Sequence, residues 1–188
     1  MADYPPFMNA YGNIPKILDK IKEAKTPERF TVDFLGTNLG FSGGSSRAFI
    51  PLAKRIGMLG ADGAPTQLYR AFRNTSSSGA AMARAIRTGY PTLFSRNEYA
   101  HKLDAGKLEG LVMEATGLEK GASTLRSIVN TFEALRRYAD FDATDTKIDG
   151  QDATPELRAP MVVADPIRKV EPRSKLLTRV EPFVLHHT

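Results

Sequence analysis

Two segments of the chain share an order of features that restricts its fold more than any other part of the sequence does. Residues 26–63 read TPERFTVDFLGTNLGFSGGSSRAFIPLAKRIGMLGADG, and residues 104–142 read DAGKLEGLVMEATGLEKGASTLRSIVNTFEALRRYADFD as a shorter echo. In each segment an apolar-patterned helix ends at a glycine step, and a turn of small residues leads into a second helix with basic side chains. We therefore predict a mainly α-helical protein in which two pseudo-repeated helix–turn–helix-like units share one core.

Apolar spacing and capping residues place the helices of the first unit. The pattern predicts a helix over 13–24, and the pair Thr26-Pro27 predicts that a second helix begins there. Ser45 or Ser46 is expected to cap a third helix, unless Pro51 delays its start or kinks it. This third helix should bury Phe49, Leu52, Ala53 and Ile56 and should display Arg47, Lys54 and Arg55 on its opposite face.

The end of the first unit contains a compact turn signal. Residues 61–65, ADGAP, are either a short wing, which would make the unit winged-helix-like, or a bend before a helix over 66–73. The serine-rich loop 74–79 then separates the first unit, 1–75, from the second unit, 76–142.

Three helices are expected in the second unit, and an irregular tail follows it. They cover 80–90, start at the capping residue Asp104, and cover 123–138. Asp, Pro and scattered charge dominate the tail, 143–188, which we interpret as a tether.

Charge is distributed unevenly along the chain. Residues 1–100 carry 13 Lys/Arg against 7 Asp/Glu, residues 101–150 carry 7 against 9, and the tail from residue 151 carries 6 against 5. A basic first unit suits a phosphate backbone, although a solvated basic surface accounts for the charge equally well. The acidic balance of the second unit favours dimerisation.

Other functional classes find little support. The chain has no cysteine, no apolar run near the ~18 residues of a membrane span and no signal-peptide pattern at its start, so we expect a cytoplasmic protein without a membrane contact. The glycine-rich stretch GTNLGFSGGSS lacks the Gly-Lys-Ser/Thr ending of a phosphate loop. The DFDAT run from Asp140 resembles the DxDxT motif of aspartyl phosphotransferases, but it follows a helix instead of the buried strand that this motif needs. The same acids do not have the spacing of a calcium-binding loop. The histidines have no further metal ligands near them in the sequence. We expect no catalysis, cofactor or metal.

Motifs in both halves resemble one known family. The first half contains DFL at Asp33, LGF at Leu39, IPL at Ile50 and DG-x-PT-x-x-Y from Asp62 to Tyr69; the second contains TGL, TF-x-AL and ADF between Thr116 and Phe141. This pattern, over about residues 10–142, resembles a bacterial domain family of unknown function. The resemblance implies a mainly helical bacterial domain and supplies no catalytic residues.

We predict that the protein binds duplex DNA, as a transcriptional regulator or a mobile-element or phage-related factor. Ser45 and Ser46 open the helix that approaches the major groove, Arg47 reads base edges, and Lys54, Arg55, Arg70 and Arg73 neutralise phosphates. Lys120, Ser123, Thr124 and Arg126 of the second unit form an auxiliary contact or a homodimer surface. The alternative is a non-catalytic helical scaffold that docks a protein partner through residues 143–188.

Overall fold

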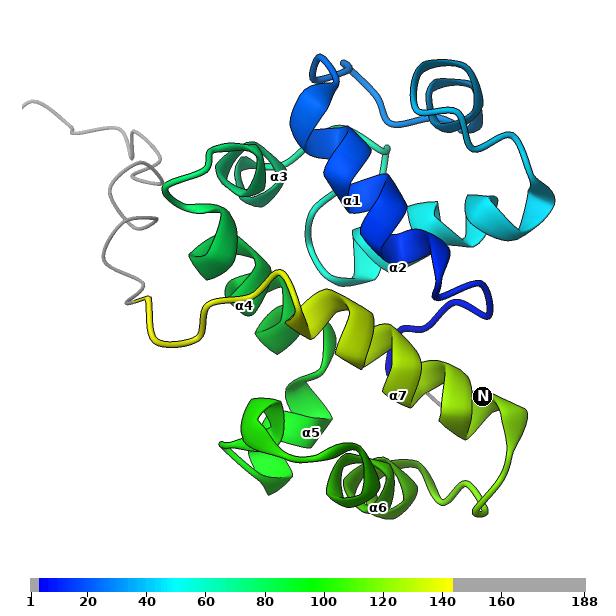
Figure 1. The fold of residues 1–188 in the computed structure, drawn as a ribbon, viewed down its shortest axis with the longest axis vertical. Helices are drawn as coiled ribbons and strands as arrows, with labels where there is room; N and C mark the ends of the chain where they lie inside the picture. The colour runs from blue at the N-terminus through cyan, green and yellow to red at the C-terminus, as the bar shows by residue number, and fades with distance from the viewer. Residues whose placement is uncertain (1–3, 144–188) are drawn as a thin grey trace, which may run out of the picture. The chain divides into compact units, whose positions relative to one another are not determined.

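Helices dominate residues 4–143, the part of the chain that the computed structural model describes (Figure 1). The α-helices are α1 (Asn13–Glu23), α2 (Phe49–Arg55), α3 (Gln67–Arg73), α4 (Ser78–Gly89), α5 (Pro91–Arg96), α6 (Ala105–Thr116) and α7 (Ser123–Arg136). A π-helical turn, η1 (Phe34–Asn38), and two 3-10 helices, η2 (Gly44–Ala48) and η3 (Ala100–Lys102), complete the set. The prediction of a mainly α-helical fold is confirmed. None of these helices is long and apolar enough to cross a bilayer.

The helix α7 lies at the centre of the packing. It contacts α1, α4 and α6, and in Figure 1 it separates α1 and α2 from α5 and α6. Its predicted apolar stripe is buried at Leu125, Ile128, Phe132 and Leu135. Buried residues from both predicted units, Met8 to Leu135, form one hydrophobic core.

The helix α4 packs closely against its neighbours because its buried side chains are small. Ala81 and Ala85 are fully buried where α4 meets α3 and α7. At its last residue, Gly89, an added Cβ would lie 2.7 Å from Cγ2 of Ile56, so only a glycine allows this approach to the end of α2.

The segment before α1 is tied to residues far along the chain. The Met8 N–H donates to Oγ1 of Thr131 at 3.1 Å, and the Tyr90 hydroxyl donates to the carbonyl oxygen of Pro6 at 2.7 Å. Both bonds are buried. They attach the N-terminal segment to α7 and to the connection between α4 and α5.

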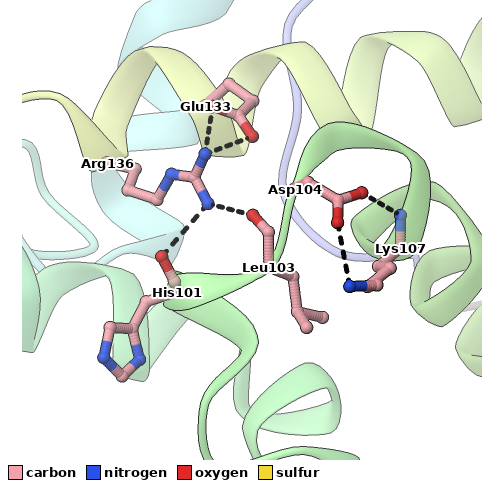
Figure 2. A network of polar contacts seen from close by, with 6 residues as sticks. All are labelled: His101, Leu103, Asp104, Lys107, Glu133 and Arg136. Atoms are coloured by element: carbon pink, nitrogen blue, oxygen red, sulfur yellow. Dashed lines mark hydrogen bonds and ion pairs between the residues drawn. The ribbon is translucent and has the colours of Figure 1, made fainter.

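Capping residues define α6 as predicted. Asp104 accepts a hydrogen bond from the Lys107 backbone N–H at 2.9 Å, and Gly117 ends the helix in the left-handed conformation at φ 70°. A guanidinium from α7 fixes the segment just before this cap (Figure 2). Arg136 donates through Nη1 to the carbonyl oxygens of His101 and Leu103, at 3.1 and 2.7 Å, and its Nη2 pairs with the Glu133 carboxylate at 2.7 Å.

The predicted start of the second helix at Thr26 is wrong, because residues 25–31 contain no helix. The helical residues here are 32–38, which include η1, and Phe30 and Leu35 are buried as predicted. The local cap signal is overridden by a long-range contact, since the Phe30 N–H donates to the Gly63 carbonyl oxygen at 2.8 Å. The Phe30 ring then packs against Phe34, Phe49 and Tyr69, with centroids 5.2, 5.9 and 6.3 Å away.

The two echoing segments therefore differ in their helices. The second has the 12-residue α6 and the 14-residue α7, whereas the first has the five-residue η1, η2 and the seven-residue α2. Their turn glycines are alike, since Gly40 and Gly117 both have positive φ, 83° and 70°. The duplication stays a prediction.

Candidate nucleic-acid interface

The first element of the candidate interface is the tight turn from η1 into η2. The backbone N–H of Phe41 donates to the Leu35 carbonyl oxygen at 2.9 Å, and Gly40 between them takes the left-handed conformation that closes the turn. Leu35 and Leu39 are buried beneath it. The apolar side chains thus fix the turn to the core and leave Ser42 to Ser45 exposed to solvent.

The helical segment that follows has the predicted inner and outer faces. Phe49, Leu52, Ala53 and Ile56 are all buried, as the spacing required. The segment begins as η2 and becomes α-helical at Phe49, so the delayed start is the correct alternative. Pro51 is the third residue of α2, where the missing N–H removes little because the first N–H groups of a helix have no intrahelical acceptor.

The serines do not cap this helix. Gly43 stands at the N-cap of η2 without a side-chain cap bond, so the predicted capping role of Ser45 and Ser46 is wrong. Ser46 is only 4% exposed, and its Oγ accepts a hydrogen bond from the Asn13 side-chain amide at 3.1 Å. Its hydroxyl therefore joins η2 to the start of α1 and faces away from solvent.

The basic side chains on the outer face differ in their attachments. Arg47 is exposed and has no hydrogen-bond or ion-pair partner among the described residues. Lys54 donates to the Ala61 carbonyl oxygen at 2.6 Å, and Arg55 donates to that of Tyr4 at 2.7 Å, while both side chains stay exposed. Arg47 is free to meet a partner, whereas Lys54 and Arg55 also hold the loops beside α2.

A short closed loop lies next to α2, and we call residues Gly60–Ala64 the bridged turn. An isolated antiparallel bridge joins Leu59 to Pro65 at its base. Inside it, the Gly60 N–H donates to the Ala64 carbonyl oxygen at 2.8 Å, and Asp62 accepts from the Ala64 N–H through Oδ1 at 3.0 Å. The Lys54 bond to Ala61 attaches this turn to α2.

The two arginines predicted on the next helix have different surroundings. Arg70 is exposed on α3. Arg73 instead donates from Nε to the Ile21 carbonyl oxygen at 2.9 Å, and from its other nitrogens to the Ala24 carbonyl and the Thr26 hydroxyl. These acceptors lie at the end of α1, so Arg73 is a cap for that helix and is not available to a phosphate.

The second group of predicted contacts lies elsewhere in the fold. Lys120, Ser123 and Arg126 are exposed and Thr124 is half-buried, all at the connection from α6 into α7. Arg126 also lines a cavity of about 270 Å³ with Glu109 and Asn130. In Figure 1 this connection lies on the opposite side of α7 from α2, so one flat contact does not include both groups.

The excess of basic residues extends beyond the predicted site residues. Between Phe34 and Asn97 there are eight Lys/Arg and a single acid, Asp62, which is hydrogen-bonded within its own turn. The basic residues that the prediction omitted are Arg84, Arg87 and Arg96, on α4 and α5. The net charge of residues 1–100 does not show this basic stretch, because most of the acidic residues in that range lie before Phe34.

The chain belongs to a family of unknown function, DUF5343, whose model matches residues 6–146. The family resemblance deduced from the motifs is thereby confirmed. Neither a curated protein nor a solved structure matches the chain. The expected protein partner for the tail concerns residues 143–188, nearly all of which lie outside the described residues.

Proposed function

We propose that the protein binds duplex DNA through η2, α2 and the bridged turn, in the manner of a winged helix. The observation that carries this proposal is the hydrogen bond from the Phe30 N–H to the Gly63 carbonyl oxygen. It places the helix-free segment that follows α1 beside a closed turn that follows α2. The resulting order is a helix, a helix-free segment, the short helices η1, η2 and α2, and a hairpin-like turn, and α2 is the helix proposed to approach the major groove.

Electrostatics support the same surface. The chain from Phe34 to Ala61 contains three basic residues, Arg47, Lys54 and Arg55, and no acid. A protein that neutralises phosphates gains affinity from counterion release, so three phosphate contacts, from Lys54, Arg55 and Arg70, predict a log–log salt slope of about −2.7. Arg47 stands near the start of the segment, where base-reading residues of helix–turn–helix proteins lie, and is the proposed base reader.

The remaining roles follow from how each side chain is held. Lys54 and Arg55 are proposed phosphate contacts whose positions are set by Ala61 and Tyr4, and the exposed Arg70 is a further one. Because α2 has only seven residues, one copy reaches few base pairs. A homodimer through the α6–α7 connection would double the site, as in helix–turn–helix dimers that bind two half-sites, and would suit a cytoplasmic transcriptional regulator or mobile-element factor.

Fluorescence anisotropy with a labelled random-sequence duplex tests the proposal. The full chain should bind at ~50 mM salt and lose affinity steeply towards ~200 mM. The triple variant Arg47→Ala, Lys54→Ala and Arg55→Ala should bind more weakly, with the slope shallower by about one unit for each of the two lost phosphate contacts, Lys54 and Arg55.

A charge-matched control separates the site from net charge. Replacing Lys16, Lys20 and Lys25, which are exposed on or beside α1, removes the same three charges. Circular dichroism checks that both triple variants are folded. Equal losses in the two variants, or no binding by the parent at ~50 mM salt, would rule out α2 as the reading element.

A further inference from the structure

Three rings from separate elements form a cluster at the end of the described chain, which we call the clasp. Phe94 comes from α5, His101 from η3, and Phe141 from the segment after α7. The imidazole of His101 is stacked on Phe141 with centroids 4.2 Å apart and planes at 19°. Phe94 lies 6.1 Å from each of the other two rings. The stack joins a histidine to a phenylalanine 40 positions later.

The clasp holds residues Asp140–Ala143, which we call the strap, against α4. The Asp140 N–H donates to the Gly79 carbonyl oxygen at 2.9 Å, and an added Cβ on Gly79 would lie only 2.6 Å from the Asp140 Cβ. Asp140 Oδ1 in turn accepts from the Asp142 and Ala143 N–H groups at 3.1 and 3.0 Å. The strap therefore has a backbone anchor at its start and a ring anchor at Phe141, and Asp142 also forms an exposed ion pair with Lys102, with Oδ1 and Nζ 4.0 Å apart.

The surroundings of His101 in the clasp favour the neutral imidazole over the imidazolium. Its Nδ1 atom is buried and makes no hydrogen bond within residues 4–143. Proton uptake would place a second positive charge beside the Arg87 guanidinium, which already lies 5.7 Å from the Phe141 ring centroid. Burial is the main reason that the pKa of His101 is lowered, and the positive charges of Lys102 and Arg87 lower it further.

The other groups around the imidazole act less strongly or are already paired. The Asp142 carboxylate and the Glu98 carbonyl favour the imidazolium, but burial and the two cations outweigh them. From α7, the Arg136 guanidinium faces the His101 backbone and is paired with Glu133, so it fixes the position of the residue without bonding its ring (Figure 2).

We propose that the clasp is a pH-sensitive latch, in which neutral His101 holds the strap on α4 and proton uptake by His101 releases it. The sign follows from linkage. A histidine that binds its proton less tightly in the closed state shifts the equilibrium towards the open state as pH falls. The open-to-closed ratio therefore begins to rise as pH drops through the ordinary histidine pKa of 6.5 and stops rising below the lower closed-state pKa. A single proton changes the open-to-closed ratio by about tenfold per pH unit at most.

The absence of tryptophan from the sequence makes a direct probe possible. The variant Phe141→Trp carries one tryptophan, inside the clasp. Between pH 8 and pH 5 its emission should shift to the red, and its quenching by acrylamide should rise severalfold as the strap opens. In the double variant His101→Phe with Phe141→Trp, the ring at position 101 has no proton to gain, so both signals should stay flat. His186 and His187 are present in both chains and cancel from the comparison.

Hydrogen exchange of the Asp140 amide provides a second measurement without a new ring. In the unmodified chain its protection, corrected for the intrinsic rate, should fall below pH 6.5, whereas in His101→Phe it should not depend on pH in this range. The same loss of protection in both chains, or full protection at pH 5 with His101 protonated by NMR, would overturn the latch.

Discussion

Arg73 donates its Nε–H to the carbonyl oxygen of Ile21, 2.9 Å away and 52 positions earlier in the chain. The guanidinium also reaches the Ala24 carbonyl and the Thr26 hydroxyl, so one side chain from α3 satisfies the open end of α1. Helix ends leave carbonyl groups without intrahelical partners, and a cation there also complements the helix dipole.

Replacing Arg73 should therefore reduce stability. Arg73→Ala should lower the free energy of unfolding by about 1.5–3 kcal/mol, as for a lost hydrogen bond to a charged group. Arg70→Ala, on the same helix but exposed, should change it by about 0.5 kcal/mol or less. Urea denaturation of the two variants measures the difference, and equal stabilities would show that the cap contributes nothing.

A second prediction concerns the stability that the buried face of α2 contributes. Phe49 is 1% exposed and packs against Phe30, so Phe49→Ala should cost roughly 3–5 kcal/mol. The neighbouring Ile50 is half-buried, and Ile50→Ala should cost about 1 kcal/mol. Thermal unfolding followed by circular dichroism compares them; a Phe49→Ala variant as stable as Ile50→Ala would contradict this packing.

Two glycines in helices should respond to alanine in opposite directions. Gly79→Ala should destabilise the protein by about 1–3 kcal/mol, because the new methyl group meets Asp140 at 2.6 Å. Gly110 has open space around it in the interior of α6, so Gly110→Ala should stabilise by about 0.5–1 kcal/mol through backbone entropy. Chemical denaturation measures the unfolding free energy of both variants. A stabilising Gly79→Ala would show that the strap moves away from the new methyl group at little cost.

The cap of α6 predicts a pH-dependent contribution. The Lys107 backbone N–H, bonded to the Asp104 carboxylate, lowers the pKa of that carboxyl from its usual value of 3.8. A carboxyl with a lower pKa in the folded state adds stability above its unfolded pKa and loses it as pH falls through the folded value. The stability difference between the parent and Asp104→Ala should therefore be largest near neutral pH and shrink below pH 3.8.

Asp104→Asn provides the matched variant for this measurement. Asparagine caps helices about as well as aspartate but does not ionise in this range. Its stability relative to Asp104→Ala should stay constant with pH. A parallel decline of the parent and the Asn variant would assign the effect to other carboxyl groups.

Helices with a strong apolar period could be predicted from the sequence. The stripes of α1 and α7 and the inner face at Phe49, Leu52 and Ile56 are buried as their spacing required, since each helix faces one shared core. Asp104 and Gly117 also bound α6 as their residue types indicate.

Contacts between distant residues could not be read from local pattern. Thr26-Pro27 is a sound local start signal, yet the Phe30 backbone pairs with Gly63 and the helical segment starts only at Val32. Ser46 and Arg73 were assigned to the candidate interface from residue type, but their partners, Asn13 and Ile21, lie 33 and 52 positions away. Nothing in a linear pattern distinguishes an exposed arginine from one that closes a helix end.

The tie between Met8 and Thr131 has a consequence for the order in which the chain can fold. The pair spans 123 positions and lies within the core. During synthesis the segment at Met8 emerges early, and its backbone N–H is bonded to water until α7 supplies the Thr131 hydroxyl. Bringing two such distant parts of the chain together lowers its conformational entropy before the contacts between them can stabilise the fold. The N-terminal segment therefore cannot take its folded position on the core until Thr131 has left the ribosome.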